Sequence, residues 1–230
     1  MKKTALKLQK DLEKLAKGLG VDLFGVADIS KIKDEIQISP KAMQKLDRAI
    51  VLGMRVSQAV LEEIEDHPTR LYFQHYRTLN AALDQTALRI SNLLQTEGFQ
   101  AIPIPASQIL DWQKQAAHLS HKKLGVLAGL GWIGRNNLLV NNVLGSQFRL
   151  VSILTDASLK ANAPLKKDCA DCFACISLCP AKAIKKSPQD FDHQSCFDKL
   201  KDFQRQKFVD QYICGICVKA CLAKGDGPLG

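Results

Sequence analysis

The stretch CADCFACISLCP, residues 169–180, carries four cysteines in the spacing C-x2-C-x2-C-x3-C and ends in proline. This is the spacing of bacterial ferredoxins that hold two iron–sulfur clusters. A cubane cluster needs thiolates from several directions. A tight backbone turn offers three of them at every third residue, and the fourth comes from elsewhere in the chain. The spacing therefore predicts an iron–sulfur redox protein.

The chain has eight cysteines, all after position 168, which matches the number of ligands that two [4Fe–4S] clusters require. In two-cluster ferredoxins the cysteine before the proline binds the other cluster. We therefore predict two ligand sets, and we use the names set one and set two for them below. Set one is Cys169, Cys172, Cys175 and Cys221, and set two is Cys179, Cys196, Cys214 and Cys217.

Two other uses of these cysteines are open. Zinc also binds C-x2-C pairs, although it usually takes two pairs rather than a triple run that ends in C-P. Disulfides are typical of small secreted domains, and residues 1–20 show no export signal. Iron–sulfur clusters are the favoured interpretation.

Outside the cysteine region the pattern predicts an α/β layer domain over residues 1–160, followed by a small cluster domain over residues 161–230. Residues 161–168 are the expected hinge between them. The small domain is too short to be stable by apolar burial alone, so metal binding is expected to contribute to its folding.

Hydrophobic periodicity and turn residues give the expected elements. Strands are expected at Val21–Ala27, Ala49–Val56, Phe99–Pro105 and Phe148–Leu154, the third at a sheet edge because of its prolines. Helices are expected within residues 1–20, at Thr69–Thr96 before Gly98, at Trp112–His118, at Leu119–Ala128, at Pro180–Ala183 and at Phe197–Phe208.

The charge and the absence of targeting signals limit the class of protein. The formal net charge is +9. Two oxidised clusters with thiolate ligands would bring it to about +5. The lysines are scattered, so a solvated surface and an anionic partner both remain open. No apolar run is long enough to span a membrane, and the expected location is the cytoplasm, where thiols stay reduced.

The turn GLGWIG, residues 129–134, matches G-x-G-x-x-G, the fingerprint of dinucleotide-binding proteins. That fingerprint needs a strand before the turn and a helix after it. Here a lysine-bearing helical stretch precedes the turn and RNNLLVNN follows it. We therefore expect neither NAD nor flavin at this turn.

The segment AGLGWIGRNNLLVNNVLGSQFRLVSILTD, residues 128–156, followed by the cysteine motif, resembles epoxyqueuosine reductase and, more distantly, the reductive dehalogenases. LGVDLFGVA at residues 19–27 and AIVLGM at residues 49–54 extend the resemblance, in the same order, over nearly the whole chain. It implies a nitroreductase-like N-terminal layer domain that binds base-off cobalamin, and a ferredoxin-like domain whose cluster with Cys179 and Cys196 lies beside the corrin. No D-x-H-x-x-G motif for histidine-bound cobalamin is present.

The resemblance implies an oxidoreductase that receives electrons from a low-potential ferredoxin or flavodoxin and acts on a small-molecule or nucleic-acid-linked substrate. The turn that would contact the corrin consists of Gly129, Gly131, Trp132, Gly134, Arg135 and Gly145. Glycines there would let the backbone approach a large flat ring, although ordinary tight turns also use glycine. Arg135 is the residue expected to contact a corrin side chain or an anionic substrate.

One residue departs from the family. Epoxyqueuosine reductases carry a catalytic Asp in a V-D-S-A-P-like pattern, where this chain has IPAS at residues 104–107, so that Pro105 replaces the acid. Asp111 and Tyr76 are the candidate catalytic residues that could donate the proton instead. Further candidates are Tyr72, His118 and His121, and the two histidines have an i, i+3 spacing that could bind a metal. A structural role is open for each.

Two hypotheses follow. The first is a cobalamin-dependent iron–sulfur reductase that resembles epoxyqueuosine reductase, in a short form that lacks the C-terminal helical repeats of longer relatives. The second is a ferredoxin-like electron-transfer or corrinoid-reducing protein without substrate chemistry of its own. The replaced Asp favours the second, and the intact glycine turn favours the first.

Overall fold

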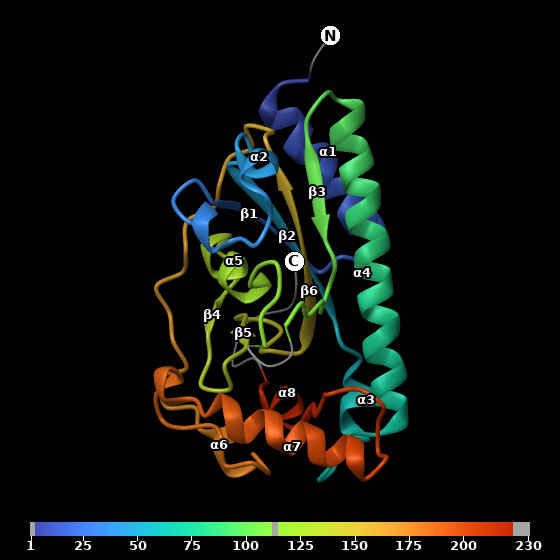
Figure 1. The fold of residues 1–230 in the computed structure, drawn as a ribbon, viewed down its shortest axis with the longest axis vertical. Helices are drawn as coiled ribbons and strands as arrows, with labels where there is room; N and C mark the ends of the chain where they lie inside the picture. Colours follow the sequence, from blue (N-terminus) through green and yellow to red (C-terminus); the bar gives the residue numbers. More distant parts are fainter. Residues whose placement is uncertain (1–2, 112–114, 223–230) are drawn as a thin grey trace. The chain divides into compact units, whose positions relative to one another are not determined.

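A computed structural model describes residues 3–111 and 115–222 of the chain, which forms two compact units from interleaved segments (Figure 1). Unit 1 consists of Met1–Met54, Asn80–Leu130 and Arg149–Leu165, and unit 2 of Arg55–Leu79, Gly131–Phe148 and Lys166–Gly230. This division differs from a single boundary at residue 160, because two earlier segments pack with the cysteine-bearing segment.

Unit 1 contains a four-stranded sheet with the strand order β1-β2-β6-β3. Its strands are β1 (Leu23–Asp28), β2 (Arg48–Arg55), β3 (Ala101–Ile104) and β6 (Phe148–Thr155). The six central residues of β2 are all buried, as its apolar run predicts. The order confirms the edge position of β3, where Pro103 lies opposite Ile153 of β6.

Helices pack around this sheet. They are α1 (Ala5–Gly18), the short η1 (Lys33–Glu35) and α2 (Pro40–Met43), α4 (Arg70–Thr96) and α5 (His121–Leu127), which contacts β1. Leu8 and Leu12 of α1 are buried, as the apolar stripe predicts. The helix at α4 is confirmed, and Gly98 follows it with a φ of 83°. Leu83, Ile90 and Leu94 of this helix are buried, whereas Leu71 near its start is 54% exposed.

Two predicted helices are absent from the described residues. Residues 112–114 of the expected helix Trp112–His118 lie outside those described, and residues 115–118 are not helical, since Ala116 forms an antiparallel bridge with Asp111. Pro180–Ala183 forms a turn rather than a helix, with Lys182 in the left-handed region at a φ of 52°.

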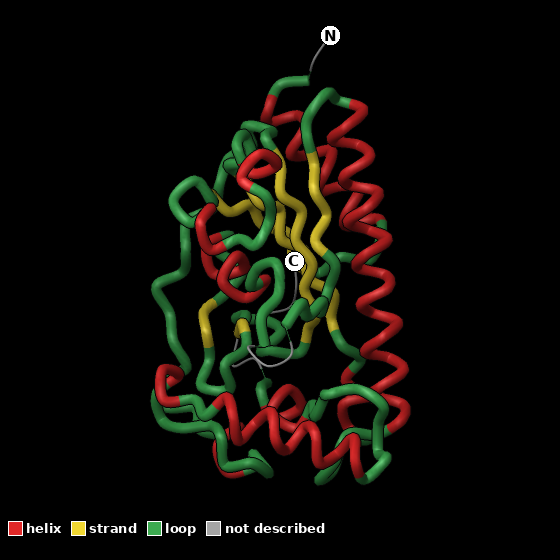
Figure 2. Tube along the Cα trace, in the orientation of Figure 1, coloured by secondary structure: helices red, strands yellow, loops and turns green. Residues whose placement is uncertain are grey.

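Unit 2 contains residues 70–79 of α4 together with short helices and a two-stranded hairpin (Figure 2). The elements are α3 (Gln58–Glu62), the hairpin β4 (Trp132–Ile133) and β5 (Leu139–Val140), α6 (Ala174–Ser177), η2 (Pro188–Asp190), α7 (His193–Arg205) and α8 (Ile216–Ala220). The helix predicted at residues 197–208 is present as α7. It begins earlier because Asp192 caps it by accepting a hydrogen bond from the Ser195 N–H.

The core of unit 2 joins residues 56–79 to the C-terminal segment. It includes Leu61, Ile64, Tyr72, Phe203 and Ile213. The cysteine-bearing segment therefore shares an apolar core with residues 56–79, in addition to any contribution from metal. The chain as a whole has a mixed α/β fold, and none of the described helices is long and apolar enough to cross a membrane.

Candidate metal centre

All eight cysteines are free thiols within unit 2, and all are partly buried. Three of set one lie on the loop and short helix α6 at residues 169–177, where the Cys172 N–H donates to the Cys169 carbonyl oxygen at 2.9 Å. The fourth, Cys221, follows α8, and α6 contacts α8. The fold thus brings the two ends of the cysteine sequence together.

For three thiols, the neighbouring cysteines that raise the pKa can be compared with the ligand sets predicted from the spacing. The cysteines that raise the pKa of Cys175 are Cys221, Cys169 and Cys172. Those that raise the pKa of Cys214 are Cys196 and Cys179. Cys217 is influenced most by Cys214 and Cys196, and less by Cys175 of set one. These neighbours support the two ligand sets, which remain a prediction.

Burial keeps these thiols protonated when no metal is bound. It raises the pKa of Cys175 to about 11 and that of Cys214 to about 12, and neighbouring cysteines add to the rise. It also raises the pKa of Cys217 well above its ordinary value, and Cys214 and Cys196 add to the rise. Since iron binds thiolates, assembly of a cluster here must displace protons.

The described part of the chain contains no group of three or more His, Cys, Asp or Glu side chains placed to hold one metal ion. A single zinc ion draws its four ligands to within about 2.3 Å of one centre. A cubane cluster binds each thiolate through a different iron, so its ligands lie further apart.

Set two lies against the apolar core of unit 2. Cys214 packs on that core, and Gly215 follows it with a φ of 88°. A Cβ on Gly215 would lie 2.6 Å from Cδ1 of Ile64 and 2.7 Å from Cε1 of Tyr72. Only glycine allows the loop before α8 to turn this close to the core.

Set one lies against the hairpin of β4 and β5. Gly134, in the turn of the hairpin, has so little space that an added Cβ would lie 2.5 Å from Cγ2 of Val140 and 3.4 Å from Sγ of Cys169. At Gly131 an added Cβ would lie 2.0 Å from the Val140 carbonyl oxygen. Close backbone packing within unit 2 therefore requires both glycines.

The other glycines of the expected corrin turn also have local roles. Gly129 has a φ of 68°, and an added Cβ would lie 2.6 Å from the Ala163 carbonyl oxygen within unit 1. Gly145 has a φ of 56° and bridges to Asn141. The structure accounts for these glycines without a corrin, so the corrinoid site depends on the resemblance.

Arg135 holds the cysteine loop. Its guanidinium donates to the carbonyl oxygens of Ala170 at 2.8 Å, Cys172 at 3.1 Å and Lys186 at 2.7 Å. It also lies over the Phe173 ring at 4.5 Å from the centroid. These bonds fix the backbone around two set-one cysteines, whereas we had expected Arg135 to contact a corrin or an anionic substrate.

Polar side chains that sequence reasoning missed surround the last set-one cysteine. Burial raises the pKa of the Cys221 thiol, and the side chain and backbone of Ser146 oppose the rise. The buried Asn136 amide donates to the Ser146 hydroxyl oxygen at 3.1 Å. The sequence placed these residues in a resembling segment but gave no sign that they face a cysteine.

A cavity of about 240 Å³ lies beside set one within unit 2. Its lining includes Cys169, Cys172, Cys221 and Trp132. The Trp132 Nε1 is buried and has no hydrogen-bond partner, and it is the only such side-chain N or O atom among the described residues. A buried indole N–H usually has an acceptor, which indicates that an acceptor belongs in this region.

The candidate acids do not form one site. Tyr72 and Tyr76 belong to the core of unit 2, and Tyr76 is 7% exposed. Asp111 lies in unit 1, where its backbone bridges to Ala116. No observation gives Asp111 or Tyr76 a catalytic role.

The two histidines do not share a helix, because α5 begins at His121. The His118 Nδ1 lies 2.8 Å from the Gln37 carbonyl oxygen. The His121 Nδ1 lies 2.8 Å from the Ser152 hydroxyl, and its Nε2 lies 3.2 Å from the Pro105 carbonyl oxygen. Burial lowers the pKa of His121 to about 4, so it is neutral at pH 7 and serves structure.

A carboxyl group does contact the loop that lacks the family Asp. Asp84 of α4 accepts a hydrogen bond from the Ala106 N–H at 2.7 Å, one residue after Pro105. Burial raises the pKa of Asp84, and the bond from Ala106 opposes the rise. Sequence reasoning missed this residue because it lies more than 20 positions before the loop.

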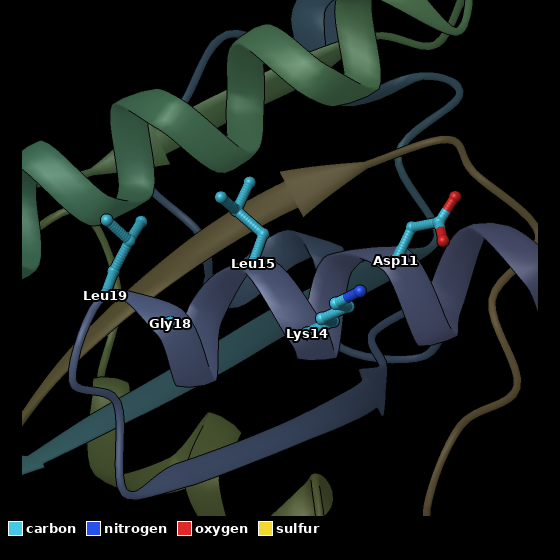
Figure 3. A pocket seen from close by; sticks show the side chains of 5 residues that line it. All are labelled: Asp11, Lys14, Leu15, Gly18 and Leu19. Carbon is cyan, nitrogen blue, oxygen red and sulfur yellow. The ribbon is translucent and has the colours of Figure 1, made fainter.

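A second hollow, of about 370 Å³, lies along α1 in unit 1 (Figure 3). Leu15 and Leu19 point from the helix into the space toward α4, and Asp11 and Lys14 are its ionisable residues. Asp11 is already paired with Lys3 at 2.6 Å. This hollow offers no chemistry comparable with that of the cysteines.

No protein-family model matches the chain. The epoxyqueuosine reductase of Leadbetterella byssophila is 36% identical over 41% of this chain and 33% of the relative. That of Cyclobacterium marinum is 26% identical over 91% of this chain and 77% of the relative. That of Escherichia coli is 35% identical over 37% of this chain and 22% of the relative. The chain thus spans a third or less of the length of two of these three relatives.

Solved structures show a similar fold. An epoxyqueuosine reductase crystal structure matches 99% of this chain and 68% of its own length, with a TM-score of 0.65 and 18% identity. A catabolic reductive dehalogenase in complex with 3-bromo-4-hydroxybenzoic acid matches 91% of this chain and 31% of its own length, with a TM-score of 0.71 and 18% identity. The matches confirm the resemblance to epoxyqueuosine reductases and, in fold, to reductive dehalogenases.

Proposed function

We propose that this chain is an iron–sulfur oxidoreductase of the epoxyqueuosine reductase type, in which the eight cysteines bind two [4Fe–4S] clusters. The observation that carries the proposal is the spacing of the eight cysteines. It is supported by the neighbours that raise the pKa of Cys175, which are Cys221, Cys169 and Cys172, and by those that raise the pKa of Cys214, which are Cys196 and Cys179. When bound, such clusters supply one-electron transfer, at potentials that reach about −400 mV or lower.

The protein's part in this chemistry is to hold and shield the clusters. Arg135 fixes the loop of Cys169–Cys172 through its carbonyl oxygens. Lys219 of α8 donates to the carbonyl oxygens of Glu62 at 3.0 Å and Ile64 at 2.6 Å, which anchors the helix that carries Cys217. Cys214 of the second set packs against the core that contains Tyr72 and Ile213.

We further propose that the electrons pass to a base-off cobalamin, which would supply a strongly nucleophilic reduced cobalt. This step follows from the resemblance and from the fold shared with a reductive dehalogenase described as B12-dependent. The candidate turn residues Gly129, Gly131, Trp132, Gly134, Arg135 and Gly145 do not by themselves require a corrin.

A nucleic-acid-linked substrate is the favoured substrate class. One epoxyqueuosine reductase of similar fold was solved with an epoxyqueuosine-modified stem loop of a tyrosine tRNA, with a TM-score of 0.66 to this chain. The net charge of +9 is compatible with such a partner. Asp84, which contacts the loop after Pro105, is the carboxyl to test as a proton donor in place of Asp111 and Tyr76.

The second candidate is an electron-transfer or corrinoid-reducing protein without its own substrate. The observation that favours it is Pro105, whose carbonyl oxygen lies 3.2 Å from a neutral His121 where the family has an acid. In both candidates a low-potential ferredoxin or flavodoxin supplies the electrons and the protein works in the cytoplasm.

The deciding experiment is anaerobic reconstitution with iron, sulfide and hydroxocobalamin, followed by gel filtration and the absorption spectrum of the protein peak. Co-elution of about one corrinoid per chain, with bleaching on addition of a low-potential reductant, supports the reductase. A brown protein without corrinoid supports the electron-transfer candidate. A colourless protein contradicts both.

A further inference from the structure

An exposed surface of unit 2 surrounds Arg135 on the cysteine loop. Phe173 follows Cys172 in the sequence and is 44% exposed, and the Arg135 guanidinium lies over its ring at 4.5 Å from the centroid. The same guanidinium donates to the carbonyl oxygen of Cys172 at 3.1 Å and to that of Lys186 at 2.7 Å. Arg135 therefore holds together an exposed aromatic ring, a lysine and a predicted iron ligand.

Two further lysines extend this surface toward set two. Lys182, Lys185 and Lys186 are all exposed. The Lys185 Nζ donates to the Lys182 carbonyl oxygen at 2.8 Å, and the Lys182 N–H donates to the Cys179 carbonyl oxygen at 3.0 Å. We use the name basic patch for Arg135, Phe173, Lys182, Lys185 and Lys186.

The charge of this segment suits an acidic partner. Residues 166–187 contain five lysines and two aspartates. The Asp168 carboxylate is engaged within its own turn, where its Oδ1 accepts from the Ala170 N–H at 2.7 Å. The proposed clusters carry negative charge, but their cysteine ligands are partly buried, whereas the three lysines of the basic patch are exposed. Exposed charges attract a partner of opposite sign and accelerate its association.

The position of the basic patch favours an electron carrier over a nucleic acid as that partner. Phe173 is adjacent to Cys172 of set one, and Lys182 is bonded to Cys179 of set two. Electron transfer between proteins slows steeply with distance, so a carrier must bind close to a cluster. A nucleic acid has no such requirement. The exposed Phe173 ring also offers the aromatic contact that is common at the centre of protein interfaces.

We propose that the basic patch is the docking surface for a small acidic one-electron carrier, which reduces the predicted clusters from this side. In each transfer the reduced carrier loses one electron and one cluster gains it, and no bond is made or broken. The inference rests on the proposed function, because it requires that a cluster forms. The lysines supply the attraction, and Arg135 holds the surface together.

The test is stopped-flow reduction of the anaerobically reconstituted chain by reduced flavodoxin, an acidic carrier, observed as loss of cluster absorption. The wild type is compared with K182E/K185E/K186E. At low ionic strength the second-order rate constant of the variant should be about tenfold smaller. In about 0.5 M salt the two rate constants should approach each other, because salt screens charges on the surface. Equal rate constants at low ionic strength would overturn the proposal.

The matched control is K7E/K10E/K14E. Its three lysines are exposed on α1 in unit 1, and the variant has the same net charge as K182E/K185E/K186E. It should keep a rate constant within about twofold of the wild type, since it leaves the docking surface intact. Equal slowing of both variants would show an effect of net charge alone and would also overturn the proposal.

Two further measurements cover loss of the clusters and the other anionic partner. Dithionite should reduce each protein to the same final extent. Should the triple patch variant lose iron, K186E decides alone, because Arg135 contacts only the backbone carbonyl of Lys186, which the substitution keeps. If the patch variant loses binding to a tRNA transcript in a gel shift but keeps the wild-type reduction rate, the basic patch binds nucleic acid and the proposal is wrong.

Iron and sulfide analysis of each sample separates this inference from the proposed function. A wild type without iron contradicts the two-cluster function itself. A wild type with both clusters, whose reduction by flavodoxin is unaffected by the patch substitutions, contradicts only the docking surface.

Discussion

Both predicted ligand sets consist of four cysteines, but the two sets pack against different parts of unit 2. Set one lies against the hairpin of β4 and β5, with the buried pair Asn136 and Ser146 in the same segment and a cavity beside Cys169. Set two lies against an apolar core through Cys214. The predicted ligands of set two are therefore more closely connected to the core of unit 2 than those of set one.

The largest effect is expected from C217S. Cys217 lies on α8 between Ile216 and Val218, which belong to or pack on the core of unit 2, so the serine loses an iron ligand next to that core. The set-two cluster and part of the stability of unit 2 are therefore lost. We expect iron per chain to fall by about half and the melting temperature to drop well below that of C172S. Iron analysis and calorimetry on both anaerobic variants measure this.

C172S is the matched comparison, because Cys172 belongs to set one and lies on the partly exposed loop. It should also lose about half of the iron but keep more of the thermal stability. Equal melting temperatures for the two variants would show that set two is no more integrated with the core than set one.

Gly215→Ala should be the next most damaging change. Its φ of 88° is strained for alanine, and the new Cβ would meet Ile64 and Tyr72. We expect a loss of about 2–4 kcal/mol in the free energy of unfolding and weaker binding of the set-two cluster. Denaturant unfolding and iron release to a chelator measure both quantities.

Gly18→Ala is the control for that substitution. Gly18 ends α1 and has no atom within 4 Å of an added Cβ, so its change should leave stability equal or slightly higher. If Gly18→Ala loses as much stability as Gly215→Ala, the loss in Gly215→Ala cannot be attributed to the contact of its Cβ with Ile64 and Tyr72.

The third prediction concerns pH in the metal-free protein. Burial raises the pKa of Cys214 to about 12 and that of Cys175 to about 11, so at pH 8 both are thiols and Cys214 has the smaller thiolate fraction. Alkylation by iodoacetamide should be about tenfold slower at Cys214 than at Cys175. The rate at both should rise about tenfold per pH unit between pH 8 and pH 10, since each is below its pKa there.

Peptide mass spectrometry after timed alkylation gives the rate at each cysteine. Faster labelling of Cys214 than of Cys175 would contradict the prediction that burial raises the pKa of Cys214 above that of Cys175.

The smallest effect is expected from R135K. Lysine cannot reach the carbonyl oxygens of Ala170, Cys172 and Lys186 at once, so the set-one loop loses bonds worth about 1–3 kcal/mol in total. Iron of set one should dissociate severalfold faster in the presence of a chelator, and iron of set two at the wild-type rate. Equal acceleration of iron release from set one and from set two would contradict a local role for Arg135.

Local patterns predicted much of this molecule. The apolar run at β2 and the periodicity of α4 identified a buried strand and a long helix, and the prolines of β3 placed it at a sheet edge. The two ligand sets inferred from the cysteine spacing remain a prediction. These features depend on residues close together in the sequence.

Contacts between distant segments escaped prediction. Residues 55–79 and 131–148 pack with the cysteine-bearing segment, so Tyr72 and Tyr76 are core residues rather than exposed acids. Gly131 and Gly134 have no room for a Cβ because Val140 packs against them, and Val140 comes close only when the hairpin forms. Arg135 is occupied by carbonyl oxygens of residues 35 to 51 positions later. Periodicity and motif spacing carry no information on such pairings.

The central claim is that the eight cysteines hold two clusters, and metal analysis with Mössbauer spectroscopy tests it most directly. On the chain purified without oxygen after reconstitution with iron-57, the account predicts about eight iron and eight sulfide per chain, all as [4Fe–4S]. About four of each, or zinc in place of iron, would contradict it.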